Sequence, residues 1–366
     1  MSQPRGTYHV EDFGAVARGI TDDPPQGQRT TNTAALNAAC AAALAGRGTL
    51  LIGPGVYHVN GPWGFSVTVD TSVAVTLKGV GSFPAAMVSS NNNAAQNFQI
   101  HSTIPNIRAV VVEDVQFVGG RTAASMLRCF YSRFTRVWFW GANQFALQLA
   151  FCGELEFEGC LFTETGAFGD AVLLFASHAV FKGTTWGEGG GGVVAFDSTM
   201  VDIGGTFQAG CYYRGKNYTD YWTTPGSPVT VSLAFYAGEE AAIIAANTDL
   251  FLHATKMRVA KIGVSIDLGH TVSLKGVHFV TDGAEFEGFV NVMRNFDLAL
   301  MVDGQFQWEA QSGYFIKEAA GLLHDAIVTA QLINHGGTIT AIGTSAPALL
   351  NPGNENNLVT TRTFTR

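Results

Sequence analysis

Charged residues are scarce in this sequence. The 21 lysines and arginines and 29 aspartates and glutamates make up 14% of the 366 residues, and the formal net charge is −8. Proteins that bind nucleic acid need a basic surface that neutralises phosphates, and anionic membranes attract the same kind of surface. The acidic balance of this chain favours neither, so we expect no nucleic acid and no membrane as partners.

Long apolar runs and a cysteine framework are missing as well. No run of about 18 apolar residues occurs, and the segment from Met1 to Thr7 lacks the hydrophobic region of a signal peptide. We therefore expect synthesis in the cytoplasm without an ordinary cleaved signal. The five cysteines are an odd number without metal-type spacing, and Cys160 stands where other repeats have valine, which predicts a small buried hydrophobic residue. We expect no metal and no other cofactor.

What the chain does contain is 47% hydrophobic residues and 43 glycines, against only 11 prolines. This composition predicts a large core and many short strands joined by turns. One segment has helical spacing instead, and it predicts a helix over Thr31–Gly46 that Thr30 or Thr31 caps at the start and Gly46 ends.

A strand pattern repeats after Gly48. Its copies are Val111–Phe117, Phe134–Phe139, Phe157–Phe162, Phe181–Trp186 and Leu274–Phe279, with Leu77–Val80 as a truncated one. Phe117 and Phe139, the last residues of two copies, are 22 residues apart, and later spacings run from 21 to 28. Such a period in strands and turns is typical of a solenoid.

We therefore predict an all-β fold, a right-handed single-stranded parallel β-helix of 10 or 11 coils with a short N-terminal capping helix. Residues 1–48 would form the entry segment and cap, 49–340 the β-helix, and 341–366 a C-terminal capping or trimer-contact tail. A leucine-rich repeat would need a Leu-x-x-Leu-x-Leu frame that is absent, and propeller blades are longer. One ladder of inward side chains is expected to contain Phe117, Phe139, Phe162, Trp186, Phe207, Phe279 and Phe306.

The N-terminal region resembles a known family. Tyr8–Ala15, Thr21–Asp23, Asn32–Ala39 and Gly48–Tyr57 resemble the entry segment of pectate-lyase-superfamily proteins. That superfamily includes bacteriophage tailspikes, polysaccharide depolymerases and alginate epimerases, so the resemblance implies a parallel β-helix. The chain departs from the pattern at Pro24–Thr31, where the family runs straight into its helix. It also lacks the aspartate cluster of calcium-dependent pectate lyases, so their calcium mechanism is not carried over.

Counting back from the last residue of each copy shows which outward residues become neighbours on adjacent coils. Glu154, Glu156 and Glu158 follow one strand, and Tyr131, Arg133, His178 and Lys182 surround them. Carboxylates at this density repel one another, so that one is expected to keep its proton with a raised pKa, as general-acid catalysis requires. A solvated sheet face with alternating charges would produce the same pattern.

Two chemistries fit this patch. In a hydrolase, Glu156 would be the acid and Glu154 or Glu158 its partner, while Arg133 would hold an acidic sugar. In a lyase, Tyr131 or His178 would take the proton, and Arg133 or Lys182 would neutralise the uronate carboxylate.

A long excursion interrupts the repeat between Phe207 and Phe235. Its aromatic and polar residues suit sugar rings, which offer an apolar face for stacking and hydroxyl groups at the edge. The substrate-binding candidates there are Tyr212, Tyr213, Arg214, Tyr218, Asp220 and Trp222. Packing of this loop on its own coil or on a neighbouring subunit is the other interpretation.

Three functions remain open. The resemblance favours a virion-associated, tailspike-like protein of a phage or prophage that binds and cleaves a bacterial surface polysaccharide. The alternatives are a non-enzymatic structural or receptor-binding spike, and a free polysaccharide lyase or epimerase. For the spike we expect a homotrimer, a virion or extracellular location after host lysis, and attachment through a virion adaptor protein or the short tails.

Overall fold

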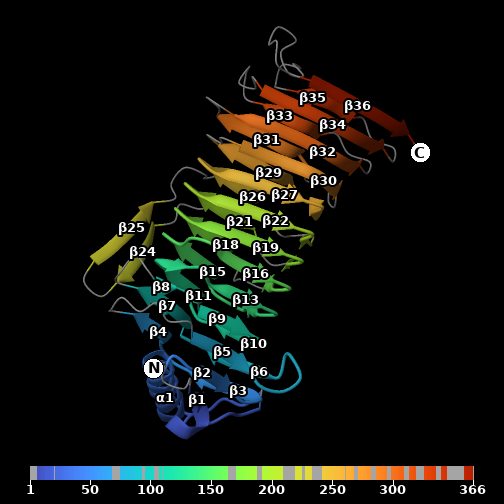
Figure 1. Ribbon diagram of the computed structural model, residues 1–366. Helices are drawn as coiled ribbons and strands as arrows, with labels where there is room; N and C mark the ends of the chain where they lie inside the picture. The colour runs from blue at the N-terminus through green and yellow to red at the C-terminus, as the bar shows by residue number, and fades with distance from the viewer. Residues whose placement is uncertain are drawn as a thin grey trace.

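The protein is an elongated coil of parallel strands with its only described α-helix at the N-terminal end (Figure 1). The computed structural model describes residues 6–19, 21–67, 75–92, 95–102, 107–108, 110–163, 170–187, 192–208, 219–224, 227–232, 241–259, 261–267, 271–281, 286–294, 298–308, 313–318, 325–334, 339–343 and 358–365. All statements below concern these residues. The predicted right-handed parallel β-helix is confirmed.

Each coil contributes strands to three walls. Wall one contains β1 (Thr7–His9), β2 (Thr49–Ile52), β5 (Val75–Gly79), β9 (Val110–Glu113), β13 (Arg133–Thr135), β16 (Leu155–Glu158), β19 (His178–Lys182), β22 (Thr199–Ile203) and β27 (Asp249–His253). Wall two contains β3 (Gly55–Val59), β6 (Ala86–Ser90), β10 (Val115–Gly119), β14 (Trp138–Trp140), β17 (Leu161–Thr163), β20 (Thr185–Trp186), β23 (Thr206–Phe207) and β28 (Lys256–Val259). Four long strands then serve both walls: β30 (Thr271–Thr281), β32 (Ala299–Trp308), β34 (Asp325–Asn334) and β36 (Leu358–Thr365).

Wall three is an 11-stranded sheet, which agrees with the predicted number of coils. Its strands are β4 (Trp63–Val67), β7 (Phe98–Ser102), β11 (Thr122–Leu127), β15 (Phe145–Ala150), β18 (Asp170–Phe175), β21 (Val193–Phe196), β26 (Ala241–Ala246), β29 (Ile262–Asp267), β31 (Gly288–Arg294), β33 (Gly313–Glu318) and β35 (Ile339–Gly343). Every residue of β11, β15, β26 and β29 is buried, so both faces of this wall are covered there. The outer faces of walls one and two carry exposed side chains and are the surfaces considered below.

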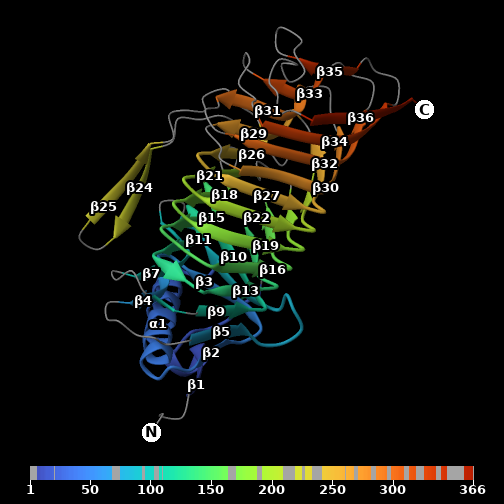
Figure 2. The same cartoon turned by 45° about the horizontal axis from the view of Figure 1, so that its top comes forward.

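Two pairs of strands lie outside the walls. β8 (Ile107–Arg108) and β12 (Cys129–Phe130) form a short parallel pair. β24 (Thr219–Thr224) and β25 (Ser227–Ser232) form an antiparallel hairpin that projects from the side of the coil (Figures 1 and 2).

Sharp corners separate walls one and two. At the corner between β9 and β10, and at each such corner from there to β30, one residue adopts a left-handed backbone conformation, which turns the chain without interrupting the parallel pairing on either side. These residues are Asp114, Arg136, Gly159, Gly183, Gly204, Ala254 and Gly276. The repeat found in the sequence therefore spans one corner and the two strands that it joins.

The predicted aromatic ladder is confirmed. All seven residues named for it are buried: Phe117, Phe139, Phe162, Trp186, Phe207, Phe279 and Phe306. The rings of Phe139 and Phe162 stack with centroids 5.0 Å apart, as do those of Trp186 and Phe207. Because parallel strands lie about 4.8 Å apart, one aromatic residue per coil brings successive rings into stacking distance.

The helix α1 (Gln26–Ala45) packs against β3 and β4 and covers the first coil, after the short 3-10 helix η1 (Val10–Phe13). It begins five residues before the predicted start, so the prediction that Thr30 or Thr31 caps it is wrong. The residue before the helix is Pro25, which is extended, and both threonines donate hydrogen bonds back into the helix. The stretch that departed from the family pattern is therefore the first part of the helix itself.

The C-terminal region adds regular structure beyond residue 340. β36 pairs in parallel with β34 from Ile327 opposite Leu358 to Asn334 opposite Thr365. β36 therefore adds one more strand to the face formed by β30, β32 and β34.

Candidate functional site

The neighbours predicted on wall one are confirmed. Arg133 pairs in register with Glu156, and Glu158 lies between Thr135 and Lys182. The backbone N–H of Tyr131 donates to the carbonyl of Gly153, which places Tyr131 one coil before Glu154. The stacking of coils thus brings the predicted residues together on one face.

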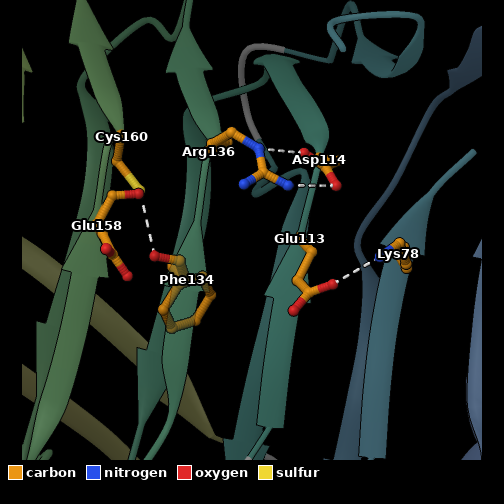
Figure 3. Close-up of polar contacts among 7 residues, drawn as sticks. All are labelled: Lys78, Glu113, Asp114, Phe134, Arg136, Glu158 and Cys160. Carbon is orange, nitrogen blue, oxygen red and sulfur yellow. Dashed lines mark hydrogen bonds and ion pairs between the residues drawn. The ribbon is translucent and has the colours of Figure 1, made fainter. Parts of the chain in front are cut away.

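Ion pairs link these side chains diagonally across the coils. Lys182 Nζ donates to Glu156 Oε1 at 2.5 Å, and Arg133 donates to Glu158. The same wall continues this alternation toward the N-terminus, where Lys78 Nζ is 2.9 Å from Glu113 Oε2 (Figure 3). Each of these carboxylates therefore faces a cation on a different coil.

An ion pair also links two residues at the corner between walls one and two. Arg136 donates from Nε and Nη2 to the two carboxylate oxygens of Asp114, at 2.6 and 2.8 Å (Figure 3). Inside the same region the thiol of Cys160 donates to the carbonyl of Phe134 at 3.5 Å, and Cys160 is buried, as predicted.

The expectation that crowded glutamates would retain a proton is wrong for Glu156. Its hydrogen bond from Lys182 lowers the pKa of this carboxyl below its ordinary value. A general acid needs the opposite shift, because it must hold a proton at the pH where it works. The alternation of charge on neighbouring coils, which the sequence already showed, stabilises the ionised form and removes Glu156 as the preferred acid.

Glu154 and His178 form a different kind of pair. Nδ1 of His178 lies 3.3 Å from Oε1 of Glu154, and the side chains are 37% and 57% exposed. Glu154 and Tyr131 both adopt left-handed backbone conformations, with φ of 53° and 55°, which turn them out of the plane of the strand. A carboxylate on Nδ1 orients the imidazole and leaves Nε2 available to accept a proton.

A hollow of about 400 Å³ lies beside this histidine, at the corner between walls three and one. Asp197 and Asn247 line it, and Asn247 Nδ2 donates to Asp197 Oδ1 at 2.6 Å. Thr199 and Asp249 line it as well, and Asp249 accepts a hydrogen bond from the backbone of β30. The sequence search missed these residues, although Asp and Asn at corner positions, where left-handed conformations are needed, were a usable signal.

The excursion leaves the coil elsewhere. It follows β23 of wall two and precedes β26 of wall three, so it does not start from wall one. Tyr212, Tyr213, Arg214 and Tyr218 lie outside the described residues, and Asp220 and Trp222 belong to β24 of the projecting hairpin. Their role in binding sugar stays a prediction.

No metal site is formed by the described residues, because no group of three His, Cys, Asp or Glu side chains there is arranged to hold an ion. Within the same residues, α1 does not have the apolar length needed to cross a membrane, nor does any other helix.

Comparison with known proteins supports the fold. The chain matches the A-module of the mannuronan C-5 epimerase AlgE6 from Azotobacter vinelandii with a TM-score of 0.50 and 15% identity, over 98% of this chain and 99% of that one. It matches ORF18 of Geobacillus virus E2 with a TM-score of 0.49 and 15% identity, but 98% of this chain corresponds to only 60% of the viral protein. The surface adhesin PfbA of Streptococcus pneumoniae matches with a TM-score of 0.48 and 9% identity, over 98% of this chain and 93% of the adhesin. No family model and no curated protein matches the sequence. At 15% identity the likeness to the AlgE6 A-module shows the fold alone, a parallel β-helix.

Proposed function

We propose that this chain binds a bacterial surface polysaccharide and cleaves it by elimination, with His178 as the base. The observation that carries the proposal is the contact between His178 Nδ1 and Glu154 Oε1 at the rim of the hollow. The scaffold agrees with this, since the epimerase with the same fold is named for acting on mannuronan, a polymer of uronic acids.

The proposed reaction needs a base and a leaving group but no oxidant. Nε2 of His178 takes the proton from the carbon beside the uronate carboxylate. The electron pair of that C–H bond forms a double bond to the next ring carbon. At the same time the bond between this second carbon and the glycosidic oxygen breaks. The departing oxygen receives a proton from water or from the hydroxyl of the exposed Tyr131, which lies two coils from His178 and one coil from Glu154.

We infer that the two cations predicted to neutralise the uronate act at sugars beside the reacting one. Lys182 follows His178 by four residues on β19, which is roughly 13 Å along the strand. It also binds Glu156, as Arg133 binds Glu158. We propose that these cations meet carboxylates of neighbouring sugars instead, and that Asn247 and Thr199 at the hollow bind hydroxyl groups of the reacting sugar.

Elimination is favoured over hydrolysis by the state of Glu156. A hydrolase with Glu156 as its acid would need this residue protonated, and the hydrogen bond from Lys182, which lowers the pKa of Glu156, opposes that.

Assembly and location are a further part of the proposal. The entry segment resembles that of bacteriophage tailspikes, and we propose a virion-associated homotrimer that attaches through an adaptor protein. Outward apolar side chains on the C-terminal half of wall one support subunit contact there: Ile203, Met301 and Ile327 are 41%, 50% and 47% exposed. A monomer mass in light scattering at micromolar concentration would contradict the trimer.

Incubation with host exopolysaccharides tests the chemistry. We expect chain shortening together with a new ultraviolet absorbance from the unsaturated sugar, and loss of both in His178→Ala and Glu154→Gln. His253→Ala is the matched control, because His253 also lies on wall one but does not line the hollow. Binding of the polysaccharide without any shortening would indicate a receptor-binding spike, and shortening without the absorbance would indicate a hydrolase.

A further inference from the structure

A second polar surface lies on the outer face of wall two, away from the hollow at His178. Residues in register there are Thr206, Lys256, His278, Gln305 and Gln331, one on each of β23, β28, β30, β32 and β34. The residues that follow the first four along the chain, Phe207, Met257, Phe279 and Phe306, are buried. Because side chains alternate along a strand, this column points outward.

The surface is concave along this column. One hollow of about 450 Å³ is lined by Thr206, Lys256 and His278, and a second of about 570 Å³ by His278, Gln305 and Gln331. His278 lines both hollows, so they adjoin at this residue, and we call the two hollows together the groove. Four strand spacings of about 4.8 Å give this groove a length of roughly 19 Å.

The groove lies where the corner between walls one and two changes its form, at β30 and β32. In β30 the corner residue Gly276 adopts a φ of 61° and bulges against β32, whose pairing shifts between Lys275 and Val277. β32 has no residue in the left-handed region, so it runs straight from wall one into wall two. The bent coils below and the straight strands above leave a concave step between them.

The groove has cationic side chains at one end, and two amides and one carboxylate at the other. Lys256 is exposed and has no carboxylate within ion-pair distance among the described residues, and Arg258 lines the same hollow. Toward the C-terminus Gln305 Nε2 donates to Gln331 Oε1 at 3.2 Å, which leaves amide groups of both side chains for a ligand. Asp303 is the one carboxylate that lines the groove within the described chain.

We propose that this groove binds a stretch of acidic polysaccharide, with a sugar carboxylate at Lys256 and His278. Sugar hydroxyl groups would donate to Asp303 and exchange hydrogen bonds with Gln305 and Gln331. The strand spacing is similar to the length of one sugar residue, so an extended chain along the axis presents one sugar to each coil. A cationic groove in a chain of net charge −8 favours an anionic ligand. This inference concerns binding alone and does not depend on the elimination at His178.

Calorimetric titration with hexamannuronate tests the groove, with neutral cellohexaose as the matched ligand. We expect the acidic hexamer to bind and the neutral one to bind at least about tenfold more weakly. Lys256→Gln should weaken hexamannuronate binding about tenfold, and His278→Gln should weaken it severalfold. Lys275→Gln should leave affinity unchanged, because Lys275 is exposed on the same strand as His278 but does not line the groove.

Three results would overturn the inference: no binding of hexamannuronate, equal weakening by Lys256→Gln and Lys275→Gln, or equally tight binding of a single-stranded DNA of the same charge. Turnover measured in parallel separates this inference from the proposed reaction. Binding that depends on Lys256 without any unsaturated product would support the groove and contradict the elimination. Formation of the unsaturated product, together with a Lys256→Gln variant that binds hexamannuronate as tightly as wild type, would support the elimination and contradict the groove.

Discussion

Replacing Phe162 with alanine tests the ladder that holds the coils together. The side chain is fully buried, and its ring stacks between Phe139 at 5.0 Å and Trp186 at 4.9 Å. It also meets Phe157 and Phe181 edge-on, each at 5.9 Å. A buried Phe→Ala change costs about 3–5 kcal/mol through lost burial and the cavity left behind. That range already includes lost ring contacts, and because Phe162 loses two stacked pairs we expect a cost in its upper part, about 4–5 kcal/mol.

The matched control is Phe151→Ala. Phe151 is 37% exposed and makes one edge-on contact, with Phe175 at 5.3 Å, so its removal should cost about 1 kcal/mol or less. Solenoids transmit stability between neighbouring coils, so denaturant unfolding should be combined with hydrogen exchange at the amides of β17 and β20. A cost for Phe162→Ala within about 1 kcal/mol of the control would refute a ladder that stabilises the stack.

Three further substitutions have predicted outcomes. Burial raises the pKa of Asp202 to about 6, so the folded protein holds this proton more tightly than the unfolded chain does. The free energy of unfolding should therefore fall by about 2–3 kcal/mol as the pH rises from about 4 to 7, and Asp202→Asn should abolish this part of the pH dependence in urea titrations. Asn32→Ala should cost about 2–4 kcal/mol in the same assay, because buried Asn32 donates to the carbonyls of Val16 and His58 and accepts from the N–H of Val16. Glu156→Gln should change the free energy of unfolding by less than about 1 kcal/mol, since the partly exposed ion pair with Lys182 stabilises little. Any cleavage should stay within a few-fold of wild type. A loss of cleavage as large as that of His178→Ala would contradict this prediction.

The fold could be predicted from the sequence because one structural unit repeats. A copy such as Phe157–Phe162 contains an inward residue on wall one, a left-handed corner at Gly159 and an inward residue on wall two. Parallel stacking converts the equal spacing of these copies into contacts, which is why Phe162 was correctly placed beside Trp186. Wall three gave no such signal, because strands such as Ala241–Ala246 are buried on both faces and do not alternate.

The charged patch could be located from the sequence, but its electrostatics could not. Register alone places Arg133 beside Glu156 and Glu158 beside Lys182. The contacts that form are the diagonals, Arg133 with Glu158 and Lys182 with Glu156. Which diagonal forms depends on side-chain conformation and local twist, and this choice lowers the pKa of Glu156. A pattern of alternating charge therefore predicts ionised glutamates more readily than a protonated one.

The residues that line the hollow at His178 could not be predicted from a fixed repeat spacing. Asp197 and Asn247 are 50 residues apart, yet they lie on successive coils and share a hydrogen bond of 2.6 Å. The excursion between β23 and β26 accounts for the extra residues, since it leaves one coil and returns to the next without changing the stacking. Long excursions are tolerated because loop closure costs only about 0.6 kcal/mol more for each doubling of length. Because the excursion separates Asp197 from Asn247 along the sequence, no fixed period connects the residues of the hollow, and His178, one coil before Asp197, was the part of it that the sequence could reveal.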